Sequence, residues 1–142
     1  MALACKPEGI ALMICDQVIT EAKTNKKTLV GVFNNVGAPQ FPCRHSRMCI
    51  FVSLTGGHGQ TTTEIRCVNE SSEKVLFSAK GNVTFKDPTH VVEAVFELQN
   101  VVFPEPGLHS IDVLSDGHLV LQRRFAVAKV EKEAEAAKRL KG

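Results

Sequence analysis

Several residue types that carry binding chemistry are scarce in this chain of 142 residues. Tryptophan and tyrosine are absent, so eight phenylalanines provide all the aromatic side chains. Trp and Tyr dominate many binding faces, and their absence removes the usual platforms for stacking on sugars. A charge bias is also missing, because 17 basic and 15 acidic residues leave a net charge of +2. We therefore expect no nucleic-acid partner, since the chain creates no strong field of one sign.

Long apolar runs and paired cysteine motifs are lacking as well. No stretch is long enough to cross a membrane, and the N-terminus lacks a basic segment followed by a long apolar one. The five cysteines are odd in number and form no Cys-x-x-Cys motif. Three of them, Cys15, Cys49 and Cys67, lie inside apolar runs, where a free cysteine acts as a small hydrophobic residue. We expect reduced thiols in a cytoplasmic protein without a membrane partner.

What the chain does contain is a succession of strand signals. Eight strand-like runs are separated by turn residues, at the spacing typical of a sandwich or barrel. The clearest is a hairpin in which Asp116-Gly117 joins an apolar run ending near Val113 to another over residues 119–127. We predict an all-β fold: a single antiparallel β-sandwich, immunoglobulin-like or Greek-key, of seven to eight strands. The predicted division is an N-terminal extension (1–8), the sandwich (9–129) and a charged tail (130–142).

Periodicity indicates how individual runs face the core. Residues 48–54 alternate cleanly, with Met48, Ile50, Val52 and Leu54 on one face. Within residues 90–102, the pattern turns Val92, Ala94, Phe96 and Leu98 inward and Glu93, Glu97 and Gln99 outward. The run 61–68 is mostly polar, which is typical of an edge strand. Gly81, inside another run, indicates a bulge or a close backbone approach.

Arg123 breaks the pattern of the last strand, because strict alternation points it at the core. Burying an unpaired guanidinium is costly. A bulge near residues 122–124, or a position at a sheet edge, would turn Arg123 outward. A functional arginine and a buried ion pair remain as alternatives.

The last residues of the chain follow a different pattern. Residues 131–140 are strong helix formers, with acidic residues first and basic residues last, in keeping with the helix dipole. The apolar stripe is thin, and a short isolated helix is marginal in water. We expect a short charged helix or a tail without fixed structure, with docking on a partner or on the sandwich as alternatives.

Several motifs occur in this chain in an order that resembles a known protein family. These motifs are Ala11-Leu12-Met13-Ile14-Cys15-Asp16, Lys27-Thr28-Leu29-Val30-Gly31-Val32-Phe33, Pro106-Gly107-Leu108-His109, Asp116-Gly117 and Phe125-Ala126-Val127. In this order the chain resembles, over residues 9–129, a family of short bacterial β-sandwich proteins whose domain has no known function. His109 stands where that family usually has an aromatic residue, which implies a half-buried histidine rather than a catalytic one. The resemblance supports the fold and leaves the activity open.

Few residues offer chemistry. Cys43 and His45 share a proline-containing loop, and with His58 from another loop they are weak candidates for a zinc or hydrolytic site. The glycines around His58 join strand to strand, whereas phosphate loops join a strand to a helix, so we interpret them as a flexible hairpin loop. We therefore expect no cofactor and a non-catalytic binding or assembly module. The module would hold a protein partner, either a second copy of this chain or another protein, through loops at the end of the sandwich or through a strand edge. A homo-oligomer is therefore possible. The alternative function is a metal-binding or hydrolytic site built from Cys43, His45 and His58.

Overall fold

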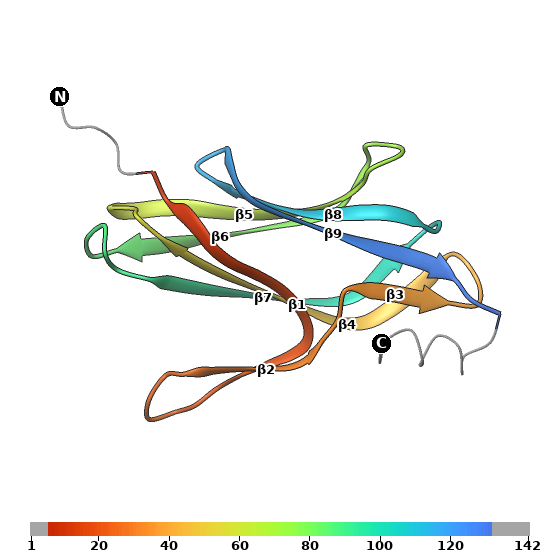
Figure 1. The fold of residues 1–142 in the computed structure, drawn as a ribbon, viewed down its shortest axis with the longest axis horizontal. Helices are drawn as coiled ribbons and strands as arrows, with labels where there is room; N and C mark the ends of the chain where they lie inside the picture. The colour runs from red at the N-terminus through yellow and green to blue at the C-terminus, as the bar shows by residue number, and fades with distance from the viewer. Residues whose placement is uncertain (1–5, 132–142) are drawn as a thin grey trace.

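Nine strands in two sheets make up the part of the chain that the computed structural model describes, residues 6–131. The predicted all-β fold is confirmed (Figure 1). The predicted helix or tail at residues 131–142 lies almost entirely outside the described residues. The strands are β1 (Glu8–Thr20), β2 (Lys27–Val32), β3 (Asn35–Ala38), β4 (Cys43–Thr55), β5 (Gly59–Asn69), β6 (Val75–Phe85), β7 (Val92–Phe103), β8 (Gly107–Ser115) and β9 (His118–Lys129).

The strands divide into a four-stranded and a five-stranded sheet. The first has the order β2-β1-β4-β7 and the second β3-β9-β8-β5-β6. All pairs are antiparallel except β3 with β9, which run parallel. β3 was not predicted from the sequence as a separate strand. A strand of four residues has too few alternating positions to produce a periodic signal.

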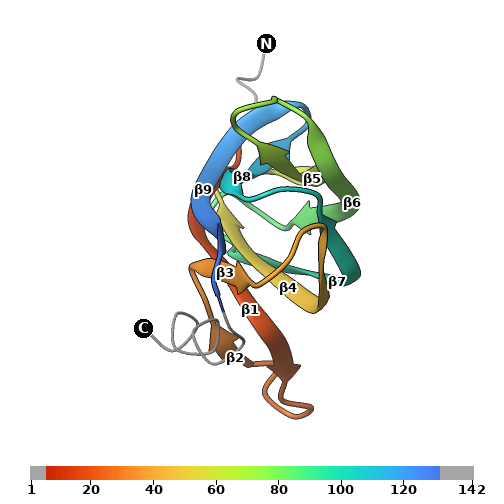
Figure 2. The same ribbon diagram turned by 90° about the vertical axis from the view of Figure 1, so that its right-hand side faces the viewer.

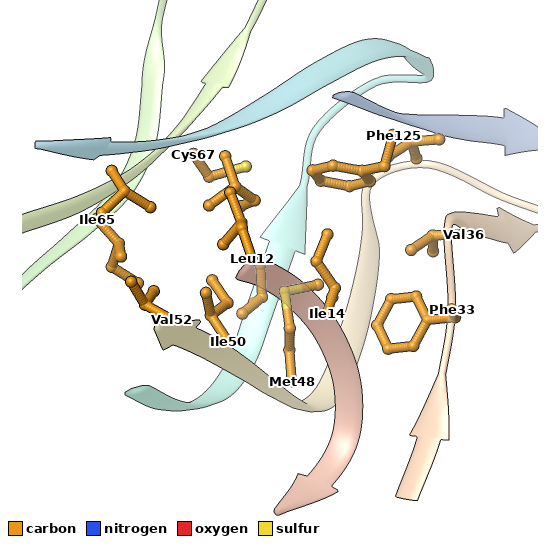
Figure 3. Close-up of a cluster of buried hydrophobic side chains, with 14 of the residues drawn as sticks. Leu12, Ile14, Phe33, Val36, Met48, Ile50, Val52, Ile65, Cys67 and Phe125 are labelled. Carbon is orange, nitrogen blue, oxygen red and sulfur yellow. The ribbon is translucent and has the colours of Figure 1, made fainter. Parts of the chain in front are cut away.

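The core lies between the two sheets and is formed by one face of each. Leu12 and Ile14 of β1, with Met48, Ile50 and Val52 of β4, face the five-stranded sheet (Figure 3). That sheet contributes, among others, Ile65, Cys67, Ile111, Val113, Phe125 and Val127. The predicted inward face of residues 48–54 is thus confirmed, although the residues between them on β4 are buried as well.

The β8–β9 hairpin has the predicted turn. Asp116 and Gly117 adopt φ angles of 47° and 85°, the left-handed values that a two-residue turn of type I′ requires at both positions. The Asp116 carboxylate accepts a hydrogen bond from the backbone N–H of Thr62 at 2.9 Å. The turn is therefore attached to the neighbouring strand β5.

One predicted edge strand is wrong. β5 pairs with β8 on one side and β6 on the other, so it is an inner strand of its sheet. Its inward side chains, Thr61, Thr63, Ile65, Cys67 and Asn69, are buried. β5 looks polar in the sequence because two of its inward residues are threonines, Thr61 and Thr63, which are buried. Threonine is common in strands, so a threonine-rich strand need not lie at an edge. The position of a strand within its sheet depends on pairing with strands that are distant in the sequence. The composition of the strand itself carries no information about those pairings.

Strand β7 changes the face it presents to the core. Val92, Ala94, Phe96 and Leu98 pack against the core as predicted, and Glu93, Glu97 and Gln99 are exposed. Val101 and Phe103 are also buried, although strict alternation from Leu98 would point them outward. Asn100, with φ of 54°, lies between the two segments. A left-handed residue at this point allows the alternation to change phase.

The second half of β1 and β2 form a two-stranded arm, residues 16–32. Cys15 is the last residue of β1 that pairs with β4, and from there β1 continues with β2 alone. Figures 1 and 2 show this arm extending beyond the other strands. Ile19, Val30 and Val32 on the arm are 47%, 41% and 43% exposed. The arm is therefore the least buried part of the four-stranded sheet.

Candidate functional site

The three candidate ligands Cys43, His45 and His58 do not meet in one site. Cys43 and His45 lie at the start of β4, whereas His58 follows its other end and is exposed. At about 3.3 Å per residue, a strand of this length separates its ends by roughly 40 Å. Within residues 6–131, no three His, Cys, Asp or Glu side chains form a group that could hold a metal ion. The loop around His58 is also not a hairpin, because β4 and β5 belong to different sheets.

Cys43 is in a poor environment for nucleophilic or ligand chemistry. It packs against the core and lies opposite Phe103 of β7. Burial raises the pKa of its thiol, and a hydrogen bond with the Phe103 backbone offsets this only in part. A raised pKa keeps the group protonated at neutral pH, and the protonated thiol is neither nucleophile nor ligand.

His45 packs against Phe33, with their ring centroids 5.3 Å apart. Burial lowers the pKa of the imidazole, and the Asp16 carboxylate offsets this in part. The unfolded chain therefore binds more protons than the folded one at pH values just below the ordinary value of 6.5. Above pH 6.5 the protonation of His45 does not reduce the free energy of unfolding. As the pH falls below 6.5, protonation favours the unfolded chain and the free energy of unfolding decreases.

We predict that His45→Gln removes part of the loss of stability in mild acid. The free energy of unfolding, measured by urea titration at about pH 7.5 and about pH 5.5, should fall more in the wild type than in the variant. Glutamine keeps a polar side chain but cannot be protonated. An equal decrease in both proteins would show that His45 does not contribute.

Arg123 remains in phase with its neighbours. The register shift in the β8–β9 pair lies between Val113 and Leu114, so the predicted bulge at residues 122–124 is wrong. Arg123 is half-buried, and its guanidinium donates hydrogen bonds to the Leu12 carbonyl of β1 and to the Asn34 side chain. β9 is an edge strand at this point, because β3 pairs only with residues 126–129. Arg123 thus links the two sheets at an edge, which keeps part of its side chain in water.

His109 is fully buried rather than half-buried. Its ring contacts both Phe103 and Phe125, at centroid distances of 5.4 and 5.6 Å. Nδ1 is 2.9 Å from the Gly107 carbonyl, and Nε2 has no hydrogen-bond partner. His109 therefore occupies an aromatic position of the core, as the resemblance implies, and it offers no accessible chemistry.

A groove opens between the edge strands of the two sheets. Within residues 6–131, β7 pairs only with β4 and β6 only with β5, so each has one edge without a partner strand among these residues. Lys80–Val83 of β6 and Glu93–Phe96 of β7 line a groove of about 330 Å³. The register of β5 with β6 is continuous at Gly81, so no bulge occurs there. A Cβ atom at Gly81 would lie 3.8 Å from Cε1 of Phe96, which leaves the groove open above the glycine.

This groove was not predicted from the sequence. Glu93 and Glu97 of β7 were predicted to face outward, and their carboxylates form ion pairs of 3.8 Å with Lys27 and Arg47, respectively. The only local signal for the groove was Gly81, whose missing side chain leaves space. That β6 and β7 both end their sheets follows from pairings between distant parts of the chain.

Comparison with known proteins assigns the chain to a family but does not indicate a biological process. No curated protein matches this sequence. Over the described residues, no helix has the length and apolar character needed to cross a membrane. The profile of a family of unknown function (DUF6941) matches residues 10–128, which span β1 to β9 almost completely. The chain therefore belongs to this family.

Proposed function

We propose that this domain is a non-catalytic binding module that holds an extended segment of a partner protein against β7. The observation that carries the proposal is the groove between the free edges of β6 and β7. A free strand edge presents unpaired backbone N–H and C=O groups, and an extended peptide satisfies them by adding a strand.

Comparison of the four sheet edges favours β7. β3 has four residues and β2 has six, with a left-handed Gly31 at φ of 71° that disturbs a regular edge. β6 has a register shift against β5 opposite Cys67 and Val68. β7 pairs with β4 without a register shift from Cys43–Phe103 to Leu54–Val92, and it is regular over residues 92–99. β7, with 12 residues, is thus the longest of these four edge strands, and it pairs with its neighbour without a register shift.

The chemistry of the groove suits an extended peptide. Val83, Ala94 and Phe96 provide apolar surface, while Lys80, Asn82 and Glu93 bring polar groups. Side chains alternate between the two faces of an added strand, so one set would contact the apolar surface and the other the solvent. We infer a partner segment in which apolar and polar residues alternate.

The fold type that we propose, an immunoglobulin-like β-sandwich, is consistent with this use. Sheets of that type have strand orders A-B-E-D and C-F-G. The order β1-β4-β7 corresponds to A-B-E, and β5-β8-β9 corresponds to C-F-G. No strand of the described residues pairs with β7 in the position of strand D. A partner strand added to β7 would occupy this position.

A peptide selection tests the proposal. Random peptides as long as β7, displayed on phage, are selected on the wild-type protein, and the affinity of an enriched peptide is measured by fluorescence polarisation. We expect Gly81→Leu to weaken binding by about tenfold or more, because the leucine fills the groove beside Phe96. Ser78→Leu is the matched control, since Ser78 is exposed on the other face of β6.

Amide hydrogen exchange locates the bound peptide. We expect slower exchange in β7 when the peptide is bound and no change in β2 or β3. The proposal is overturned if no peptide is enriched, if Gly81→Leu binds as tightly as Ser78→Leu, or if the protection lies outside β6 and β7.

A further inference from the structure

Two thiols face each other where the arm leaves the four-stranded sheet. Cys15 of β1 is the direct cross-strand partner of Cys49 of β4, and both have free thiols. The Cys15 thiol donates to the Gln17 carbonyl at 3.4 Å, and the Cys49 thiol donates to the Asp16 carbonyl at 3.6 Å. Both sulfur atoms therefore lie beside the same short stretch of β1.

The backbone geometry of this pair is that of a cross-strand disulfide. Directly opposed residues of antiparallel strands have Cα atoms about 4.5–5.5 Å apart. Disulfides span Cα distances of about 4.4–6.8 Å. Opposed residues also point their side chains to the same face of the sheet. A bond between these two residues therefore requires no change of register.

We propose that Cys15 and Cys49 form a redox switch that fixes the root of the arm, with a peroxide as the oxidant. One thiolate attacks a peroxide oxygen and becomes a sulfenic acid, and the other oxygen leaves as water. The second thiol attacks the sulfenic sulfur, which forms the S–S bond and releases a second water. Two thiols and one hydrogen peroxide thus give one disulfide and two waters. A dithiol then reduces the disulfide to two thiols and is itself oxidised to a disulfide.

Access to the pair depends on the arm. Both cysteines are 0% exposed, so the closed structure shields them from the oxidant. Among the described residues β2 pairs only with β1, and the Lys27–Glu93 ion pair of 3.8 Å is its link to β7. An element with few partners opens at lower cost than the core. Burial also raises the pKa of the Cys15 thiol, so we expect oxidation to follow opening of the arm rather than occur in the closed state.

Peptide mapping tests the switch directly. The protein is treated with hydrogen peroxide in a Cys5→Ser background and digested with trypsin, without prior reduction. Cys15 then lies alone in the first tryptic peptide, and Cys49 lies alone in the peptide that begins at Met48. We expect these two peptides to be linked, with a mass lower by two hydrogens than their sum, and to separate after dithiothreitol.

Substitutions provide the matched comparison. Cys49→Ser should abolish the link, whereas Cys43→Ser, at the first residue of β4, should retain it. We also expect slower amide exchange in the arm after oxidation. Should Cys49→Ser fail to fold, the peptide map of the Cys5→Ser protein decides alone. The proposal is overturned if the intact folded protein yields no Cys15–Cys49 link, or if the link also forms in the same amount in Cys43→Ser protein unfolded by urea.

Discussion

Replacing Phe103 by alanine should lower the free energy of unfolding by about 3–5 kcal/mol, the range found for removing a buried aromatic ring. Phe103 is 0% exposed and meets two other rings edge-on, His109 at 5.4 Å and Phe125 at 6.0 Å. Its strand lies in one sheet and theirs in the other, so its removal opens a cavity between the sheets. Equilibrium unfolding in urea, with the slope compared to the wild type, measures the effect.

His109→Phe is the control for the same cluster. The substitution keeps a ring beside Phe103 and Phe125 and removes Nε2, a buried nitrogen without a partner. It also loses the contact between Nδ1 and the Gly107 carbonyl. We expect these effects to offset each other within about 1 kcal/mol. A loss as large as that of Phe103→Ala would show that the Nδ1 contact, rather than the ring, is what the fold requires.

Gly57→Ala should cost about 1–3 kcal/mol, which is typical of overpacking in a well-filled core. A Cβ atom at Gly57 would lie 2.5 Å from Cδ2 of Phe85, far inside the contact distance. Phe85 is 1% exposed, so its ring has little room to move away. The thermal midpoint and the urea midpoint should both decrease.

Gly81→Ala is the matched change at a glycine where a methyl group fits without a clash. Its added Cβ would be 3.8 Å from the nearest ring atom of Phe96, an ordinary contact. Because glycine within a strand is less stable than alanine by about 0.5–1 kcal/mol, we expect Gly81→Ala to be neutral or stabilising. Equal destabilisation by the two substitutions would contradict the packing of Phe85 on Gly57.

Features that depend on neighbouring residues were predictable. The turn at Asp116-Gly117 requires left-handed backbone at two consecutive positions, and that requirement is visible in the residue types themselves. The inward faces of residues 48–54 and 92–98 follow from alternation within a single strand. The family resemblance implied a half-buried His109 in place of an aromatic residue, whereas the structure buries it completely.

Features that depend on the pairing of distant strands could not be predicted from the sequence. β5 was placed at an edge because its residues are polar, yet it lies between β6 and β8. Cys49, Phe51 and Ser53 alternate with the core residues of β4 and are nevertheless buried, so β4 is covered on both faces. The candidate site failed for the same reason: the distance between His45 and His58 depends on the course of β4, and their spacing in the sequence does not report it.

The sequence by itself determined the all-β class, the hairpin turn and the face that each regular strand turns inward, because φ preferences and side-chain alternation act over a few residues. Only the tertiary structure decided which strands end the sheets, which thiols face each other and where a groove opens. Those properties arise from hydrogen-bonded pairing between strands far apart in the chain. The free edge of β7 and the Cys15–Cys49 pair are both of this second kind.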